Sequence, residues 1–427
     1  MVDTGCRSRR ETLIALCFLP LMMLVAGPAT APLLCADTPM PQMGKSVTDF
    51  GVSPDNSPET NHEKLQAAID WASERGALLF VPPSSAPYRV RSGLTLRRNV
   101  SLVGANGPTG RGTRHPERAQ PVGSVFAIED ADAPFITVEG ATRIEGLQFW
   151  YPHQSRTDPA KIIAYPPTIR ASDKTPAQGV FLSRLTFYGE FFAMDFRTRR
   201  NNCCELVTIE HCYGYPLGGR FVAIDYCYDI PRVLHCHVNP SNQRFFAGGF
   251  SRAVIDSVIA RKTFAYSIDH TDNAQLVDVF TFGTYGGIRL GPATYGQLTN
   301  FNFDCVTVGI HKSGDSTKNR NWQIAQGSII ANCGEKVEDV HPIIIDGMGH
   351  TSLVNVEAFS GLNGAVTAIG RSFDFLLVEG DRKLTISLFG CRMRDYVADS
   401  PLTIRNPNAV IQAVGCLDRD ENPYRYP

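Results

Sequence analysis

The sequence predicts an all-β chain wound into a parallel β-helix, capped at its N-terminal end by a short helix. Three observations predict this. From about Ile144 onward the chain consists of short β-type runs with few helical stretches. Two columns of polar residues recur at about one coil, or roughly 20–26 residues. A short amphipathic helix precedes them and is followed only by short strands.

The composition fits one extended folded domain. The 427 residues are 43% hydrophobic and 19% charged, with a formal net charge of −1. These values exclude a disordered chain and give no electrostatic reason for binding nucleic acid or an anionic membrane. Because solenoids grow by adding coils, the length is compatible with a single domain. We expect that domain to span residues 46–417, with the N-terminal cap and first coils at 46–110 and a C-terminal tail at 418–427.

The N-terminal segment is typical of a targeting signal. Arg7, Arg9 and Arg10 precede the apolar run Leu13–Gly27, and Ala29 to Ala31 supply small residues at a cleavage site. We therefore expect a cleaved signal peptide at 1–31, a linker at 32–45, and a secreted or periplasmic protein with no membrane attachment after cleavage. The apolar run is short and interrupted by proline, which disfavours a membrane span.

A helix and four strands are expected in the cap. Asn61 is a good N-cap for a helix that stops near Gly76. Its apolar face is formed by Leu65, Ala68, Ile69 and Ala72. Strands follow at Leu78–Val81, Tyr88–Val90, Leu94–Leu96 and Val100–Val103. Such a cap would protect the unpaired strand edges at the end of a solenoid.

The first polar column predicts a ladder on the outer surface. Its members each follow an apolar residue: Asp195, Asp225, Asp269, Arg289, His311 and Asp346. The long step between Asp225 and Asp269 is expected to contain a further strand at Phe245–Phe250. Strands on successive coils lie about 4.8 Å apart. We therefore expect Asp195 and Asp225 on neighbouring coils, about 5 Å apart, and Asp225 and Asp269 two coils apart, about 10 Å.

The second polar column predicts an inward ladder of amide and carboxylate side chains. It comprises Thr208, Asp256, Asp278, Asn300, Gln326 and Asn355. Stacked side chains of this type hydrogen-bond to one another and to turn backbone.

Nine cysteines lie beyond the signal region: Cys203, Cys204, Cys212, Cys227, Cys236, Cys305, Cys333, Cys391 and Cys416. Their odd number and irregular spacing do not indicate a disulfide framework. Several lie in β-rich runs, which favours inward-stacked thiols. One or two disulfides, or a metal site, are the alternatives.

The opening of the predicted domain carries a family resemblance. Residues Val47 to Ala105 include VTDFGVSPDNSPETNHEKLQAAIDWA, GALLFVPP and NVSLVGA. This stretch resembles the start of the pectate-lyase superfamily domain, which rhamnogalacturonases, polygalacturonases, some epimerases and phage tailspikes share. The resemblance implies a right-handed parallel β-helix, action outside the cytoplasm and a carbohydrate ligand. The chain departs from the family's first-loop motif at Pro54 to Asn56, and it lacks the four catalytic motifs of polygalacturonase-type hydrolases.

The candidate catalytic residues are not carried over from the family. Asp195, Asp225 and Asp269 come from the first column, and Glu210 comes from the segment Ile209–Pro240. Two carboxyl groups suit glycoside hydrolysis, at about 5–5.5 Å in retaining enzymes and roughly 6.5–9.5 Å in inverting ones. The alternative is that these aspartates are solvated surface groups or bind calcium.

The segment Ile209–Pro240 is densest in residues that could bind sugar. The candidate substrate-binding residues are Tyr213, Arg220, Tyr226, Tyr228, His211, His237, Arg289 and His311. Aromatic rings suit the apolar faces of sugars, and Arg220 could grip a uronate carboxylate with two hydrogen bonds. The alternative is that the aromatic rings pack between coils. His235, His237 and His211 lack a fourth ligand at zinc-site spacing, so no metal site is predicted.

We expect a glycoside hydrolase acting on a pectin-like, uronate-containing polysaccharide. One alternative is a lyase, with Lys262, Arg261 or His237 as the base and Ca²⁺ or an arginine neutralising the uronate. Another is a non-catalytic, glycan-binding adhesin. No cofactor is expected for the hydrolase. The chain is expected to be a monomer or a homotrimer.

Overall fold

The computed structural model describes residues 43–105, 123–242, 249–314, 321–331, 337–360, 374–396 and 399–426. The predicted signal peptide, most of the linker and Cys333 lie outside these residues. Contacts divide the chain into Met1–Pro41 and Gln42–Pro427, and only the second unit is described.

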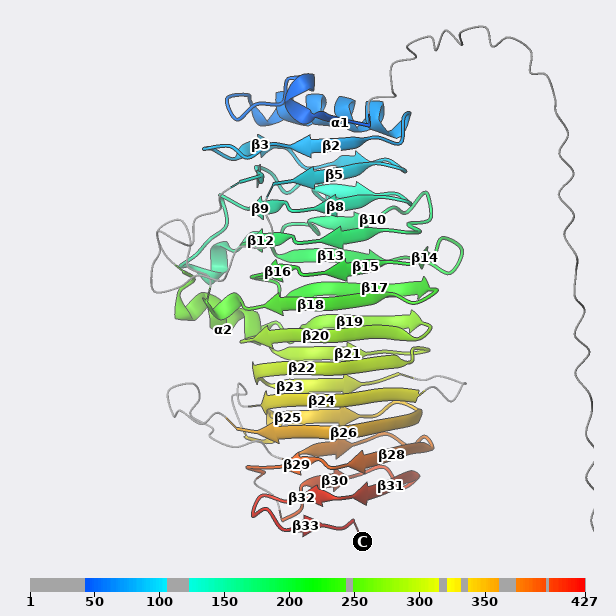
Figure 1. Ribbon diagram of the computed structural model, residues 1–427. Helices are drawn as coiled ribbons and strands as arrows, with labels where there is room; N and C mark the ends of the chain where they lie inside the picture. The colour runs from blue at the N-terminus through cyan, green and yellow to red at the C-terminus, as the bar shows by residue number, and fades with distance from the viewer. Residues whose placement is uncertain are drawn as a thin grey trace, which may run out of the picture. The chain divides into compact units, whose positions relative to one another are not determined.

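This unit is a right-handed parallel β-helix built from two long sheets (Figure 1). The 21-stranded sheet contains β1 (Gly44–Ser46), β2 (Leu78–Val81), β3 (Tyr88–Val90), β5 (Ser101–Gly104), β6 (Val125–Ile128), β8 (Arg143–Glu145), β9 (Gln148–Trp150), β11 (Phe181–Ser183), β12 (Thr186–Tyr188), β15 (Thr208–Glu210), β16 (Tyr213–Gly214), β18 (Arg232–Val238), β20 (Ala274–Phe282), β22 (Gly296–Val306), β24 (Asn321–Ala331), β26 (Gly349–Phe359), β28 (Leu384–Phe389), β29 (Arg392–Met393), β31 (Ala409–Val414), β32 (Cys416–Leu417) and β33 (Pro423–Tyr424).

The 12-stranded sheet contains β4 (Leu94–Leu96), β7 (Ile136–Val138), β10 (Ile169–Ala171), β13 (Phe192–Arg197), β14 (Cys204–Glu205), β17 (Arg220–Tyr228), β19 (Phe264–Thr271), β21 (Gly286–Leu290), β23 (Val308–Lys312), β25 (His341–Ile345), β27 (Leu376–Val378) and β30 (Leu402–Ile404). The helices are α1 (Pro58–Ser73) and α2 (Arg252–Ala260), with 3₁₀ turns η1 (Val47–Phe50), η3 (Pro159–Lys161), η4 (Pro240–Asn242) and η5 (Val337–Asp339).

The capping helix α1 starts earlier than predicted. Ser57 is its N-cap, and the Ser57 hydroxyl accepts a hydrogen bond from the Thr60 amide at 3.2 Å. Pro58 occupies the first helical position, where its missing N–H costs nothing. Asn61, the predicted cap, is instead buried inside the helix and donates to the carbonyls of Ser53 and Arg89. The helix ends at Ser73, before Gly76.

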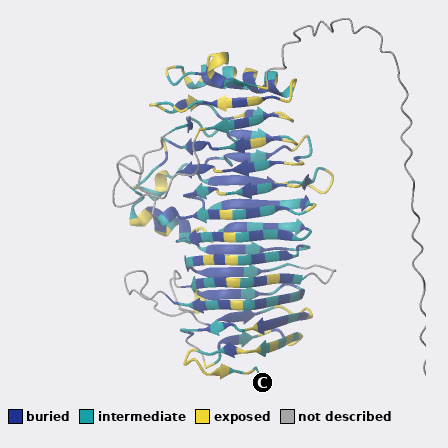
Figure 2. Ribbon diagram, in the orientation of Figure 1, coloured by how far each residue is buried: buried dark blue, intermediate teal, exposed yellow. Residues whose placement is uncertain are grey.

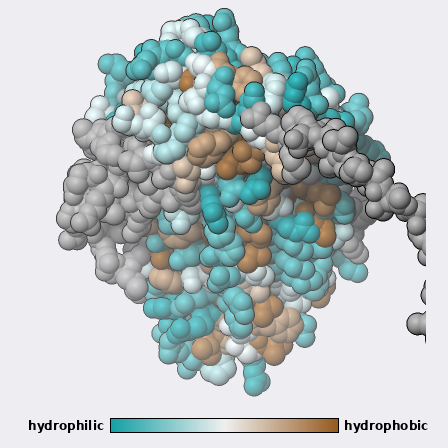
Figure 3. Space-filling model, turned by 45° about the horizontal axis from the view of Figure 1, so that its top comes forward, coloured by the Kyte–Doolittle hydropathy of each residue, from teal (hydrophilic) through white to brown (hydrophobic). Residues whose placement is uncertain are grey.

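The apolar face of α1 is confirmed, because Leu65, Ala68, Ile69 and Ala72 are fully buried. The four cap strands are confirmed to within one residue as β2, β3, β4 and β5. Figure 3 tilts this end forward and shows mostly hydrophilic side chains over it.

The core runs along the coil stack between the two sheets. Phe149 stacks on Phe126 and on Phe187, with ring centroids 6.4 and 5.1 Å apart. Buried residues alternate with more exposed ones along the long strands β20 to β26 (Figure 2). Each coil therefore contributes one layer of a continuous apolar interior.

The predicted strand at Phe245–Phe250 is wrong where it can be checked. Residues 243–248 lie outside the described ranges, and Phe250 belongs to no strand. Instead, Ser251 caps the helix α2 by accepting a hydrogen bond from the Val254 amide. Asp256, assigned to the second column, lies in α2 and pairs with Arg252 at 2.8 Å.

The rest of the second column marks an outward corner and not an inward ladder. Asp278, Asn300, Gln326 and Asn355 are all exposed and have φ between 51° and 55°. Each follows a registered pair in the 21-stranded sheet, so they stack coil upon coil. Amide and acidic residues recur because they tolerate left-handed backbone better than branched residues do. Thr208 lies in β15 and is not part of this corner.

Among the described residues, the structure contains no helix that is both long and apolar enough to cross a bilayer.

Candidate functional site

Two aspartates face each other on neighbouring strands of the 12-stranded sheet. Asp225 on β17 is registered directly with Asp269 on β19. The prediction that they lie two coils apart is wrong, because the segment between them contains α2 in place of a strand. Their Cα atoms are therefore about one strand spacing, or roughly 4.8 Å, apart.

Asp195 is displaced from this pair. On β13 it is registered with Ala223, and Arg197 is the residue opposite Asp225. The predicted alignment of Asp195 with Asp225 is thus wrong by two residues. Arg197 grips the Asp195 carboxylate through Nε and Nη2, at 2.8 and 2.7 Å. This bidentate ion pair engages both oxygens of the Asp195 carboxylate.

Asp269 is a mostly buried carboxyl group with one free oxygen. Its side chain is 14% exposed, and Oδ2 accepts a hydrogen bond from Arg289 Nη1 at 2.9 Å. Oδ1 is buried and has no hydrogen-bond partner. Burial raises the pKa of Asp269, and the charge of Asp225 adds to this, while Arg289 opposes it. A raised pKa is the direction that a general acid requires.

Gly291 makes room for this carboxyl group. A Cβ atom added at Gly291 would lie 1.5 Å from Asp269 Oδ1. The Asp269 side chain thus leans away from Asp225 and over β21, into space that any other residue would fill.

Asp225 has a different environment. Its side chain is 25% exposed, and Oδ1 accepts a hydrogen bond from His270 Nδ1 at 2.9 Å. The His270 ring lies flat against that of Tyr226, with centroids 4.4 Å apart and an interplanar angle of 2°. This contact fixes the imidazole that orients the Asp225 carboxylate.

Arg289 and His311 are registered with each other on β21 and β23, below the aspartate pair. His311 Nε2 donates to Asp346 Oδ2 at 3.1 Å. Asp346 lies two positions beyond Ile344, the registered partner of His311, so the first column does not stay in register at its last member.

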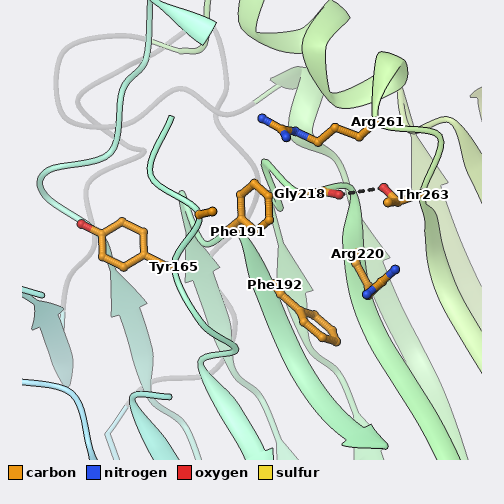
Figure 4. A pocket seen from close by; sticks show the side chains of 8 residues that line it. Tyr165, Phe191, Phe192, Gly218, Arg220, Arg261 and Thr263 are labelled. Carbon is orange, nitrogen blue, oxygen red and sulfur yellow. Dashed lines mark hydrogen bonds between the residues drawn. The ribbon is translucent and has the colours of Figure 1, made fainter. Parts of the chain in front are cut away.

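A pocket of about 590 Å³ opens beside these strands (Figure 4). It is lined by Ala164, Tyr165, Phe191, Phe192, Gly218, Arg220, Arg261 and Thr263. The guanidinium of Arg261 lies 4.9 Å from the Phe191 ring, and that of Arg220 lies 5.4 Å from the Phe192 ring. The Arg197 guanidinium also lies over Phe192, at 5.5 Å, so Phe192 connects the pocket to the aspartate cluster.

The pocket carries positive charge from two arginines. Burial lowers the pKa of Arg220, and the nearby charges of Arg197 and Arg289 lower it further. Arg220 Nε is buried without a hydrogen-bond partner. Aromatic rings together with two guanidinium groups can hold the apolar face of a sugar and its carboxylate.

Four predicted site residues lie elsewhere. Glu210, His211, Tyr213 and His237 belong to or adjoin strands of the 21-stranded sheet. His211 stacks on His235 at 4.7 Å, and His237 stacks on Phe280 at 4.3 Å. Because stacked rings cover each other's faces, this column favours the packing interpretation over sugar binding. Glu210 accepts a hydrogen bond from Ser183.

Tyr228 lies on β17, three residues beyond Asp225, and is registered with Glu205. Within the described residues, no group of three or more His, Cys, Asp or Glu side chains is placed to hold a metal ion.

Three residues of this cluster were missed from the sequence. Arg197 follows Asp195 by two positions, which places both on one face of a strand. His270 directly follows Asp269, and Phe192 opens the same strand as Asp195. The alternation of side chains along a β-strand could have identified Arg197. No local sequence signal indicates that Phe192 lines a pocket.

Glu190, next to the pocket residue Phe191, gives a stability prediction. It is fully buried, Oε1 accepts a hydrogen bond from the Tyr215 amide, and Oε2 has no partner. Burial raises its pKa well above that of an exposed glutamate. As pH rises above about 4.3, the unfolded chain loses this proton while the folded chain retains it, so stability falls.

We therefore expect Glu190→Gln to stabilise the protein increasingly from pH 4 to pH 8, by about 1.4 kcal/mol per unit of pKa shift removed. Urea denaturation across this range measures the effect. Glu74→Gln, at a side chain that is 71% exposed, is the control and should change little. A pH-independent difference for Glu190→Gln would contradict the assignment.

Comparison with known proteins gives similarity in fold alone. No family model matches the sequence. No curated protein matches it either. Solved structures similar to this chain include DFA-IIIase from Arthrobacter chlorophenolicus A6 in complex with GF2, at 12% identity over 87% of this chain and 99% of that one, with a TM-score of 0.43.

An exopolygalacturonase from Thermotoga maritima is similar at 10% identity over 91% of this chain and 93% of that one, with a TM-score of 0.45. A tailspike protein of E. coli bacteriophage HK620 in complex with a pentasaccharide is similar at 11% identity, over 87% and 66% of the two chains, with a TM-score of 0.49. All three structures are below 25% identical to this chain and have TM-scores below 0.5. At such identities they carry no residue roles over to this chain.

Proposed function

We propose that this protein is a glycoside hydrolase that cleaves an acidic, uronate-containing polysaccharide. The observation that carries the proposal is the Asp225–Asp269 pair, in which two registered carboxyl groups have unlike environments. Paired carboxyl groups whose surroundings push their pKa values apart are the usual basis of acid and base roles in glycoside hydrolysis.

In this proposal Asp269 is the general acid. Its raised pKa is the direction that suits donation of a proton to the leaving glycosidic oxygen. Asp225, oriented by His270, is the base that activates water or the nucleophile that attacks the sugar. Because the Asp269 side chain leans toward Gly291, the two carboxyl groups are farther apart than the strand spacing. The anomeric form of the first product distinguishes an inverting from a retaining mechanism.

The pocket is proposed to bind an acidic sugar unit. Arg220 and Arg261 supply positive charge, and Tyr165, Phe191 and Phe192 supply ring faces. We further propose that the protein acts outside the cytoplasm after removal of residues 1–31, as a monomer or homotrimer.

A panel of purified neutral and acidic polysaccharides, assayed for new reducing ends and for unsaturated products, tests the function. We expect new reducing ends with at least one acidic polysaccharide, and their loss in Asp225→Asn. Glycan binding with no product of either kind would support the non-catalytic alternative. A fully active Asp225→Asn variant would show that the carboxylates are wrongly assigned.

Arg220→Ala is expected to raise KM for the acidic substrate by about 10-fold or more, because a charge-assisted contact contributes roughly 1.5–3 kcal/mol. The same polysaccharide with its carboxyl groups reduced to alcohols should show little change. Arg405→Ala removes a guanidinium that pairs with Glu379 at the far end of the same sheet, and it serves as the control. Equal losses on both substrates would argue against carboxylate recognition.

Arg289→Gln is expected to move the alkaline limb of the pH–kcat/KM profile to higher pH. Arg289 holds the pKa of Asp269 down, so its removal lets that pKa rise further and the acid keeps its proton over a wider range. The position of the limb is the measurement, whatever the change in rate. An unmoved limb would mean that another group is the acid.

A uronate lyase is the second candidate, and the environment of Arg220 favours it. The Arg220 guanidinium, together with that of Arg261 in the same pocket, could neutralise a uronate carboxylate, which β-elimination requires. Ultraviolet-absorbing unsaturated products, without hydrolysis products, would select this reaction over hydrolysis.

A further inference from the structure

Six of the cysteines form three pairs on neighbouring strands. Cys204 on β14 is registered with Cys227 on β17. Cys212 and Cys236 immediately precede Tyr213 and His237, which are registered with each other. Cys391 and Cys416 likewise precede the registered residues Arg392 and Leu417. All six side chains are buried, with at most 1% exposure.

The two thiols of each pair are close enough to influence each other. Burial raises the pKa of Cys212, with a further contribution from the Cys236 thiol, and the neighbouring thiols of Cys204 and Cys416 raise the pKa of Cys227 and of Cys391. Registered residues of neighbouring strands have Cα atoms about 4.8 Å apart, inside the window of roughly 4.4–6.8 Å that a disulfide spans. Each pair therefore has the backbone spacing and the side-chain direction that a cross-link requires.

The pairing is specific. Cys305 is also buried, but it lies at the irregularity of β22 between Phe303 and Val306, and no described cysteine is registered with it. Cys203 is half-exposed and pairs with no described cysteine, although it directly precedes Cys204. In every pair the two cysteines are separated in sequence by one coil.

We propose that these three pairs are sites of disulfide formation, and that each disulfide ties one coil of the β-helix to the next. In each, two S–H bonds are lost and one S–S bond forms. The two electrons and two protons pass to an oxidant of the disulfide class, which is reduced to two thiols. The proposal is independent of the reaction that the protein catalyses.

Burial decides when the cross-links form. It raises the pKa of the Cys212 thiol, and the neighbouring Cys204 thiol and burial do the same for Cys227, so the reactive thiolate is scarce at these two pairs once the coils have packed. Cys416 differs, because the neighbouring Cys391 thiol lowers its pKa to about 6, which favours a thiolate in the third pair. Oxidation of the first two pairs therefore occurs while the coils assemble, in a compartment that supplies a disulfide oxidant, and a folded, reduced protein should resist oxidation at those two pairs until a coil opens.

The full-length protein, unfolded and refolded in a mixture of reduced and oxidised glutathione, tests the proposal. Remaining thiols are alkylated in denaturant, and peptides are mapped by mass spectrometry with and without reductant. We expect three linked peptides: Cys204–Cys227, Cys212–Cys236 and Cys391–Cys416. We also expect Cys203 and Cys305 to be alkylated without reduction.

The absence of a link would overturn the proposal for that pair, and links between cysteines of different pairs would overturn it altogether. Cys391→Ala should abolish one link and leave the other two, whereas Cys305→Ala should leave all three. The wild-type map is decisive by itself, so the test does not depend on the folding of either variant. The oxidised protein should also unfold at a higher urea midpoint than the reduced one.

Discussion

Asp269→Asn is expected to lower kcat/KM on the natural polysaccharide by about 10²–10⁴-fold, the range that a positioned proton donor contributes. The amide has nearly the same shape as the carboxyl group and can still accept a hydrogen bond from Arg289. It cannot supply a proton to the leaving oxygen. The rate of release of reducing ends, compared with that of the wild type, measures the loss.

The dependence of the activity loss on the leaving group of the substrate distinguishes a general acid from a merely structural residue. An aryl glycoside with a good leaving group needs no proton, so Asp269→Asn should retain most of its activity on such a substrate, while Asp225→Asn should lose activity on both substrates. Asp173→Asn is the control, because Asp173 is a half-exposed carboxylate that pairs only with Arg170 among the contacts seen. Equal losses for Asp269→Asn on both substrates would contradict its role as the acid.

Gly291→Ala is expected to reduce activity nearly as far as Asp269→Asn, without altering the fold. The new methyl group would occupy the place of Asp269 Oδ1, only 1.5 Å away, so the carboxyl group must rotate out of its position. Gly291 does not have a positive φ, and alanine therefore adds no backbone strain. Thermal unfolding should show a folded protein, and kcat/KM should show the loss. Ser313→Ala, at the position directly after the next strand β23, is the control and should remain active.

The activity losses caused by Gly291→Ala and Asp269→Asn should not be additive. If Gly291→Ala acts only by displacing the Asp269 side chain, the double variant should be no less active than Asp269→Asn alone. Additive losses would mean that Gly291 has a separate role, such as close approach of the substrate to β21.

The fold was predictable because its signals are local. The α1 face at Leu65 to Ala72 and the cap strands follow from apolar periodicity, and the buried state of these residues confirms it. The capping residue was misplaced because Ser57–Pro58 and Asn61 both suit a helix start, and tertiary contacts to Ser53 and Arg89 use Asn61 elsewhere.

The register was not predictable, because it depends on the lengths of the connections. The step between Asp225 and Asp269 was divided into two coils, but it contains one coil and an inserted helix. An error of one coil doubles the expected separation. Periodicity identifies residues that share a column but cannot count insertions within it.

Closeness in sequence was a poor guide to the site. Glu210 and Asp225 are separated by less than one coil, yet they belong to different sheets. Asn300 and Gln326 were assigned inward because polar residues recurred there, whereas the recurrence reflects a left-handed bend. The periodic signal was real, and its physical cause was misidentified.

The insertion that carries α2 has a consequence for how this scaffold can change. The strands on either side of it, β17 and β19, remain in register through Asp225 and Asp269 despite the extra residues between them. Arg261 and Thr263, by contrast, reach the pocket only through that insertion. Arg220 shares β17 with Asp225, so only part of the pocket lining is encoded apart from the proposed acid and base. Exchanging this single excursion would change that part of the pocket while both carboxyl groups stay in place.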